Sequence, residues 1–130
     1  IIICNDWQTA ILPILLKNKY NNNEKYKNIK TINFIHSIDN NAKLSEGIFN
    51  NFNLDIDYKK NSNILFESMK SFDLNILLDS KKKVNLSKIN KNKTWASIYK
   101  KSKTKLIVYP EDRVDWAKFL DKITKSINKL

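Results

Sequence analysis

The sequence of 130 residues is long enough for one hydrophobic core and too short for two. It has a net charge of +11 and one cysteine, which excludes an internal disulfide framework. No run approaches the roughly 18 apolar residues of a membrane span, and no signal-peptide pattern is present. These limits favour a soluble or peripherally bound protein. Because the first residue is not Met, we expect a piece of a longer chain.

The basic character comes almost wholly from lysine. Arg113 is the only arginine among 24 basic residues, and asparagine and isoleucine are also abundant. Proteins selected to bind nucleic acid usually keep arginines for bidentate contacts to phosphates and bases. Nucleic acid is therefore an open but not favoured partner, since positive charge still attracts polyanions.

The chain opens with a predicted strand and helix. Ile1–Cys4 is a β-branched apolar run typical of a strand buried on both faces, with Cys4 as a small buried hydrophobe. Asp6 is a good N-cap for a helix over residues 7–20, in which Pro13 should kink the helix or delay its start. Asp6 also follows the carboxyl end of a strand, where open α/β sheets bind ligands. It can be a cap, a ligand contact or both.

A second buried strand is predicted over residues 29–35, and the only histidine, His36, follows it directly. Strand, helix and strand in this order make a right-handed βαβ unit. The fold class is therefore α/β, with Rossmann-like βαβ layers and a small parallel sheet. Taken alone, His36 is most simply a structural histidine.

Three segments carry a family resemblance. Asn5-Asp6-Trp7-Gln8-Thr9-Ala10, followed by Leu12-Pro13, resembles the His-Asp-Trp-Gln-Thr-Ala segment of bacterial glycogen synthases and plant or algal starch synthases. Residues 30–36, Lys-Thr-Ile-Asn-Phe-Ile-His, resemble the family's Lys-Thr-Val-Phe-Thr-Ile-His. Glu46-Gly47-Ile48-Phe49 is similar to its Gln-Gly-Ile-Phe. The resemblance is specific over residues 1–49, and residues 50–130 are divergent and rich in lysine and asparagine within what we expect to be one domain.

The resemblance implies transfer of glucose from a nucleotide sugar, ADP-glucose or UDP-glucose, to an α-1,4-glucan. The site would lie between two Rossmann-like domains, of which this chain is part of the N-terminal one. Asp6 and His36 would be the catalytic residues, and Trp7, Gln8 and Gly47 would bind substrate. No metal or further cofactor is implied, and the compartment would be the cytoplasm or the plastid stroma.

The departures from the family pattern bear on activity. Asn5 stands where the family has histidine, and Ser37 where it has asparagine. The Lys-x-Gly-Gly loop that holds the nucleotide diphosphate is absent, and with Gly47 as the only glycine no phosphate-binding glycine loop can form. The donor-binding domain is absent as well. We therefore expect no turnover by this chain alone.

The middle of the chain is less regular. Residues 37–60 read as loop with a short apolar patch that folds back on the sheet edge, and Asp55 and Asp57 there read as solvated surface. Residues 61–63 cap a helix whose apolar stripe includes Leu65, Met69, Phe72 and Ile76. Residues 76–79 and 84–87 are similar to a helix end and a strand of the same family.

The last third is predicted as helix, strand and helix. Trp95, Ile98 and Tyr99 lie on one face of a lysine-rich segment, which favours a docked helix over exposed aromatics that stack on a base or sugar. Leu106–Tyr109 is a strand closed by Pro110. The final helix begins near residue 111 or 112 and contains a helical ion pair, Asp121 with Lys125. Its predicted buried stripe is Val114, Ala117, Leu120, Ile123 and Ile127.

A second function class competes with the transferase. A non-catalytic interaction protein could keep the βαβ core and use its basic surface within a larger assembly, including one with RNA. That reading predicts a partner that buries Trp95, Tyr99 or the final helix. The transferase reading requires instead an upstream segment with a Lys-x-Gly-Gly motif and a downstream donor-binding domain. Its shared cleft also requires that Asp6 and His36 do not lie on opposite faces.

Overall fold

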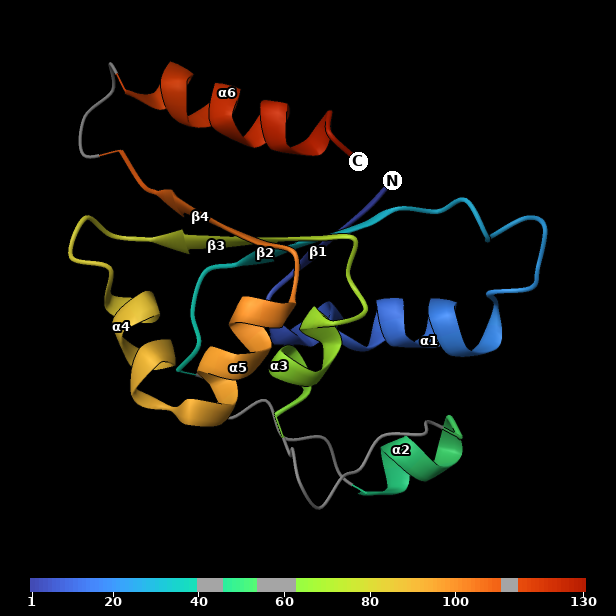
Figure 1. Ribbon diagram of the computed structural model, residues 1–130. Helices are drawn as coiled ribbons and strands as arrows, with labels where there is room; N and C mark the ends of the chain where they lie inside the picture. The colour runs from blue at the N-terminus through green and yellow to red at the C-terminus, as the bar shows by residue number, and fades with distance from the viewer. Residues whose placement is uncertain (40–45, 54–62, 111–114) are drawn as a thin grey trace.

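The computed structural model describes residues 1–39, 46–53, 63–110 and 115–130. Its centre is a sheet of four parallel strands in the order β1 (Ile2–Asn5), β2 (Thr31–Ile35), β3 (Leu74–Asp79) and β4 (Thr104–Val108). Neighbouring strands in the sheet are also consecutive strands of the chain (Figure 1). The α/β class with a small parallel sheet is thus confirmed.

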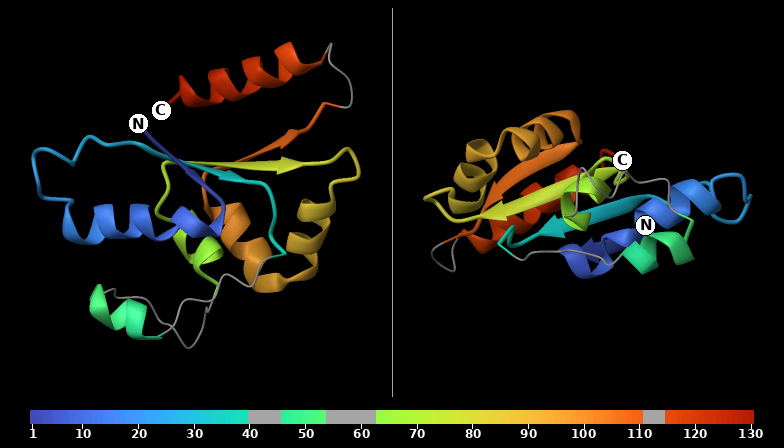
Figure 2. Two further views of the ribbon diagram at one scale, coloured as in Figure 1. Left: turned by 180° about the vertical axis from the view of Figure 1, so that it is seen from behind. Right: turned by 90° about the horizontal axis from the view of Figure 1, so that it is seen from below.

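Helices cover both faces of this sheet (Figures 1 and 2). One face carries α1 (Ile11–Lys19), α3 (Ile64–Met69), α4 (Val84–Lys91) and α5 (Lys93–Lys101), and the other carries α6 (Trp116–Ile127). The short helix α2 (Glu46–Asn51) lies beyond α1, on the side away from the sheet. Because both faces are covered, β2 and β3 are buried along nearly their whole length, and most of their residues are apolar.

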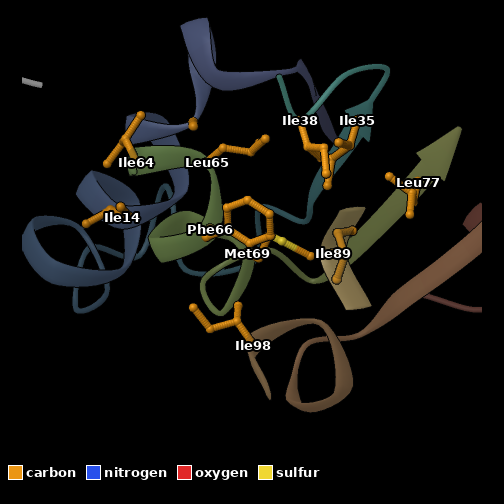
Figure 3. Packing of buried hydrophobic residues seen from close by; sticks show 11 residues of the cluster. Ile14, Ile35, Ile38, Ile64, Leu65, Phe66, Met69, Leu77, Ile89 and Ile98 are labelled. Atoms are coloured by element: carbon orange, nitrogen blue, oxygen red, sulfur yellow. The ribbon is translucent and has the colours of Figure 1, made fainter. Parts of the chain in front are cut away.

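The larger apolar cluster fills the space between the sheet and the four-helix face (Figure 3). Ile35 of β2 and Leu77 of β3 belong to this cluster. Phe66 lies at the centre of the cluster, with 1% of its surface exposed. The Phe66 ring stacks on Trp95 of α5, with 4.4 Å between ring centroids. This contact confirms that Trp95, Ile98 and Tyr99 dock a helix face against the core.

The N-terminal strand differs from its prediction in one respect. β1 lies at the edge of the sheet, and Ile3 is 55% exposed, so the expectation of burial on both faces is wrong. Cys4, on the opposite face, is buried as predicted, and burial raises the pKa of its thiol. The parallel pairing of β1 with β2 confirms the strand, helix and strand unit.

The first helix starts later than predicted. A 3-10 turn, η1 (Trp7–Thr9), precedes α1, which begins at Ile11. Pro13 is the third residue of α1, where its missing amide costs no helical hydrogen bond. Pro13 therefore delays the helix start, which was one of its two expected effects.

The predicted helix stripe through residues 65–76 crosses an element boundary. Asn63 caps α3 as predicted, accepting from the Leu65 amide at 3.1 Å, but the helix ends at Met69. Ile76 belongs to β3, a fully buried strand in the middle of the sheet. The helix expectation is wrong for Phe72 and Ile76, since the tertiary structure continues the chain as a strand.

The segments after β3 also correct the family-based expectation. Residues 84–87, expected as a strand, are the first turn of α4. The predicted strand over 106–109 is confirmed as β4, which begins two residues earlier and ends one residue earlier. It is the fourth strand because β3 precedes it. Asn92 between α4 and α5 caps α5 by accepting from the amides of Thr94 and Trp95.

The final helix buries only part of the predicted stripe. Phe119 is buried, whereas Leu120 is 56% exposed, and Ile123 and Ile127 are half-buried. The expected stripe is wrong at Ala117 and Leu120, because α6 packs on the apolar β3–β4 face through Phe119. The ion pair between Asp121 and Lys125 is confirmed at 2.7 Å.

Part of the predictions lies outside the described residues. These are the start of the final helix at 111 or 112, Val114, Asp55, Asp57 and the part of the apolar patch after residue 53. Within residues 37–60, α2 was not expected. Across the described ranges, no helix combines the length and apolar character needed to cross a bilayer.

Candidate functional site

Polar side chains gather where the four strands end. Asp6 follows β1, His36 follows β2, Asp79 ends β3 and Tyr109 follows β4. All four strands are parallel, so their carboxyl ends lie at one edge of the sheet. In open α/β sheets this edge is where ligands bind.

Asp6 connects two neighbouring strand ends. Its Oδ1 accepts from the backbone amide of His36 at 2.7 Å and from that of Ser37 at 3.3 Å. It makes no hydrogen bond to the helix that follows, so the N-cap expectation is wrong. The carboxylate is directed across the sheet edge because Asp6 has φ 50° and ψ −155°, a rare conformation for a non-glycine residue. Such strain concentrates at functional sites.

The His36 imidazole has a partner on each side. Its Nδ1 lies 2.6 Å from the Tyr109 hydroxyl, and its Nε2 lies 3.4 Å from the Asn5 side-chain oxygen. The rings of His36 and Tyr109 are near parallel, at 28°. If the phenol donates to Nδ1, the ring proton is on Nε2, where the Asn5 side-chain oxygen can accept it.

Tyr109 is half-buried, and burial raises the pKa of its phenol, with a further contribution from the Asp6 carboxylate. Its ring also stacks on Phe119 of α6, with centroids 5.7 Å apart. The phenol therefore stays protonated as a hydrogen-bond donor at neutral pH. Its position is fixed by the helix on the far face of the sheet.

Two further residues support this edge from β3 and α4. The Asn85 side chain donates to the backbone carbonyls of His36 at 3.0 Å and Leu78 at 3.1 Å. The buried Asp79 carboxylate accepts from three amides, those of Ser80, Asn85 and Leu86. Asp79 thereby anchors the first turn of α4 and holds Asn85 under the His36 carbonyl.

The expected substrate-binding residues lie in three different surroundings. Trp7 is half-buried and packs against the larger apolar cluster, with its indole nitrogen buried and unpartnered among the described residues. Gln8 is exposed in η1, next to the site edge. Gly47 is exposed in α2, which lies beyond α1 and away from the sheet (Figure 1). The structure thus joins Asp6 with His36 and keeps Gly47 apart.

The sequence reasoning passed over Tyr109, Asp79 and Asn85. Tyr109 follows the last strand just as Asp6 and His36 follow the first two, and Pro110 marks the strand end. The position rule that selected Asp6 could therefore have found Tyr109. Asp79 and Asn85 could not be found in this way, because β3 itself was expected to be helical.

The chain is thus a parallel α/β protein with a neutral and acidic hydrogen-bonding site at the carboxyl edge of its sheet. Such a site offers fixed hydrogen-bond donors and acceptors to a ligand. Its sequence matches the starch synthase catalytic domain family over residues 1–106. Because that match covers most of the chain, the chain belongs to this family.

Individual relatives match a shorter stretch. A glycogen synthase of Clostridium perfringens is 53% identical over 38 residues, and one of Clostridium acetobutylicum is 58% identical over 38 residues. A glycogen synthase of Chlorobium chlorochromatii is 51% identical over 37 residues. Each stretch is 28–29% of this chain and 8% of the relative. No solved structure matches the chain significantly.

Proposed function

We propose that this chain contributes the sugar-binding edge of a glycogen or starch synthase-like transferase. The reaction would move glucose from ADP-glucose or UDP-glucose to an α-1,4-glucan. The observation that carries the proposal is the hydrogen-bonded cluster of Asn5, Asp6, His36 and Tyr109 at the carboxyl edge. Family membership supplies the chemistry to which this cluster is assigned.

His36 would act as the central contact to the transferred sugar. His36 is exposed, its Nε2 lies beside the Asn5 side-chain oxygen, and Tyr109 fixes the ring plane, so a sugar hydroxyl would meet a preorganised group. The His36 backbone carbonyl could also stabilise positive charge at the anomeric carbon. That carbonyl already accepts from Asn85, which orients it and leaves one lone pair for a ligand.

Asp6 would act as a positioning residue with a second role toward substrate. One oxygen, Oδ1, holds the His36 and Ser37 amides, while Oδ2 has no hydrogen-bond partner in the described structure. That second oxygen can accept from an acceptor-side hydroxyl. Trp7 would support the site through packing and Gln8 through direct contact, and Gly47 would reach substrate only together with other parts of a longer protein.

Turnover would need groups that the described chain does not supply. The site holds a carboxylate, an imidazole and a phenol, but its hydrogen bonds among the described residues involve no lysine or arginine that would hold a diphosphate. A donor-binding domain, in the same polypeptide or in another chain, would supply it. We therefore expect sugar binding without glucose transfer by residues 1–130.

The test is an amide-resolved NMR titration of the chain with maltoheptaose, ADP-glucose and UDP-glucose. We expect shifts of the Asn5, Asp6, His36 and Ser37 amides, and loss of those shifts in His36→Ala. Lys17→Ala on α1, an exposed lysine away from the edge, should leave them unchanged. Shifts confined to other surfaces, or none, would count against the proposal, as would glucose incorporation by the chain alone.

A further inference from the structure

Three aromatic rings lie in sequence between the candidate site and α6. The Tyr109 ring is near parallel to that of His36, at 28° with 6.4 Å between centroids. It is also near parallel to the ring of Phe119, at 23° with 5.7 Å between centroids. We call His36, Tyr109 and Phe119 the ring ladder. Because Phe119 belongs to α6, the ring ladder links the carboxyl edge of the sheet to that helix.

Phe119 holds the far end of the ring ladder in place. Its side chain is 7% exposed and packs in the smaller apolar cluster, beside Ile107 of β4. Trp116, at the start of α6, contacts the Phe119 ring edge-on with 5.2 Å between centroids. Tyr109 is only half-buried, so the stacked Phe119 ring gives the phenol a fixed surface to rest on.

The contact between Tyr109 and His36 depends on which group carries the proton. The Tyr109 hydroxyl lies 2.6 Å from Nδ1 of His36. Burial raises the pKa of this phenol above the ordinary tyrosine value of about 10, so at neutral pH the phenol has a proton to donate. A neutral imidazole has one nitrogen that donates and one that accepts. Nδ1 can therefore accept from Tyr109 only when the ring proton is on Nε2.

The second ring nitrogen, Nε2, faces an acceptor. The side-chain oxygen of Asn5 lies 3.4 Å from it. If the neutral ring carried its proton on Nδ1, Nε2 would direct a lone pair at this oxygen, and the phenol would lose its acceptor. A charged ring would donate to both oxygens. For the neutral ring, the contacts on the two sides of His36 therefore agree on a proton at Nε2.

The Nε2 proton is available to a ligand. A separation of 3.4 Å is long for an N–H···O bond, which usually spans about 2.7–3.2 Å. His36 and Asn5 are both exposed, so a ligand oxygen can approach Nε2 and replace this contact. His36 would then meet the ligand as a hydrogen-bond donor. A sugar hydroxyl oxygen can accept this bond, whereas an ammonium group cannot.

We propose that Phe119 is a positioning residue for the candidate site. Through Tyr109 it keeps neutral His36 in the form with its proton on Nε2, and the site thereby selects a ligand that accepts a hydrogen bond at that point. The identity of the ligand rests on the proposed function, but the state of His36 does not. A Phe119 that served only to stabilise α6 would not affect the position of this proton.

The experiment is a long-range ¹H–¹⁵N NMR spectrum of the 130-residue chain labelled with ¹⁵N-histidine. His36 is the only histidine, so both ring nitrogens are assigned without ambiguity. At about pH 8.5, an ordinary imidazole is neutral and an ordinary phenol is protonated. A ring held in one neutral form shows the largest difference between its two ¹⁵N shifts, and a mixture of forms narrows it. The wild-type chain should show a wide difference, with the proton on Nε2.

Four variants test the ring ladder. Tyr109→Phe removes the donor, and Phe119→Leu removes the stacked ring but keeps an apolar side chain, so both should narrow the shift difference. Phe119→Tyr keeps the ring and should retain the wild-type spectrum. Tyr99→Phe is the matched control, because it removes a half-buried phenol from α5 and should leave the spectrum unchanged.

A further control separates positioning from stability. Leu74→Val removes volume from the apolar cluster that contains Phe119, but at the first residue of β3, on the amino edge of the sheet. It should leave the spectrum unchanged. Circular dichroism checks that each variant folds, and Phe119→Met, which also lacks a ring, replaces Phe119→Leu if the latter does not.

Three results would overturn the proposal. A wild-type ring with its proton on Nδ1, or with an even mixture, would mean that these contacts do not select Nε2. An unchanged spectrum in Tyr109→Phe would remove the phenol from the selection. Equal narrowing by Leu74→Val and Phe119→Leu would reduce Phe119 to a structural role. Because no ligand is present, failure of the sugar titration alone would leave the state of His36 standing.

Discussion

Asp6 is a single residue that holds two strand ends together. Its Oδ1 satisfies the amides of His36 and Ser37, which otherwise lie at an edge without strand partners. Replacing Asp6 with alanine should lower the free energy of unfolding by about 1–2 kcal/mol, because two amides lose a charged acceptor. Urea denaturation measures this change, and Asp6→Asn should lose less because it keeps an oxygen.

The matched control is Asp39→Ala. Asp39 is an exposed carboxylate that pairs with Lys88 at 2.5 Å on the surface. An exposed ion pair contributes about 0–1 kcal/mol, so this variant should be nearly neutral. If the two variants destabilised the chain equally, Asp6 would have no special role in joining the strands.

Two half-buried phenols predict how stability depends on pH. Burial raises the pKa of Tyr109, with help from Asp6, and raises the pKa of Tyr99, with help from Asp79. The unfolded chain therefore releases these protons at lower pH than the folded chain does, and stability should fall as the pH rises above about 10. Tyr99→Phe with Tyr109→Phe should lose less stability between pH 9 and pH 11.

Absorbance at 295 nm, which reports phenolate, gives a second measurement of the same effect. The wild-type chain should show phenolate formation above the range of ordinary tyrosines, and the double variant should lack that component. A wild-type titration curve that lies wholly within the range of ordinary tyrosines would show that neither phenol is perturbed.

At the scale of the element, α6 tests how a helix chooses its buried face. Phe119 is 7% exposed in contact with Ile107, while its neighbour Leu120 is 56% exposed. Phe119→Ala should cost about 3 kcal/mol through the cavity it leaves, and Leu120→Ala about 0.5 kcal/mol or less. Thermal unfolding of both variants measures the difference. A larger loss of stability in Leu120→Ala than in Phe119→Ala would instead support the buried stripe predicted from the sequence.

The boundary between α3 and β3 shows why a periodic pattern misled. Leu65, Met69, Phe72 and Ile76 fit helical spacing, yet β3 is apolar at four of its six positions and so matches helical spacing by chance. The backbone amides of Ser71 and Phe72 both donate hydrogen bonds to the Ser68 carbonyl, and the helix ends there. A strand buried on both faces has no period of its own that could mark its start.

At the scale of the molecule, β1 leaves one edge of the sheet open. Ile3 is 55% exposed there, and an apolar edge strand is a template for pairing with other chains. We expect Ile3→Lys to change the free energy of unfolding by no more than about 0.5 kcal/mol and to reduce self-association. Sedimentation velocity at rising concentration tests this, and association unchanged by the lysine would mean that β1 is not the contact.

The candidate site was predictable only in part. Asp6 and His36 could be placed at one edge because each follows a strand of a recognisable unit, and the bond between them confirms that placement. Their roles in transfer remain predictions. Tyr109, Asp79 and Asn85 join the site from β4, β3 and α4. They come from elements whose position in the sheet the local pattern did not show.

The sequence by itself determined the family, the parallel α/β class, the first βαβ unit and the buried helix face around Trp95. These depend on short motifs and on local spacing, which act within about ten residues. Only the tertiary structure decided the middle strand β3, the face of α6 and the partners of His36. Those features depend on contacts between segments distant in the chain, and burial against a sheet overrides local periodicity when apolar residues are this dense.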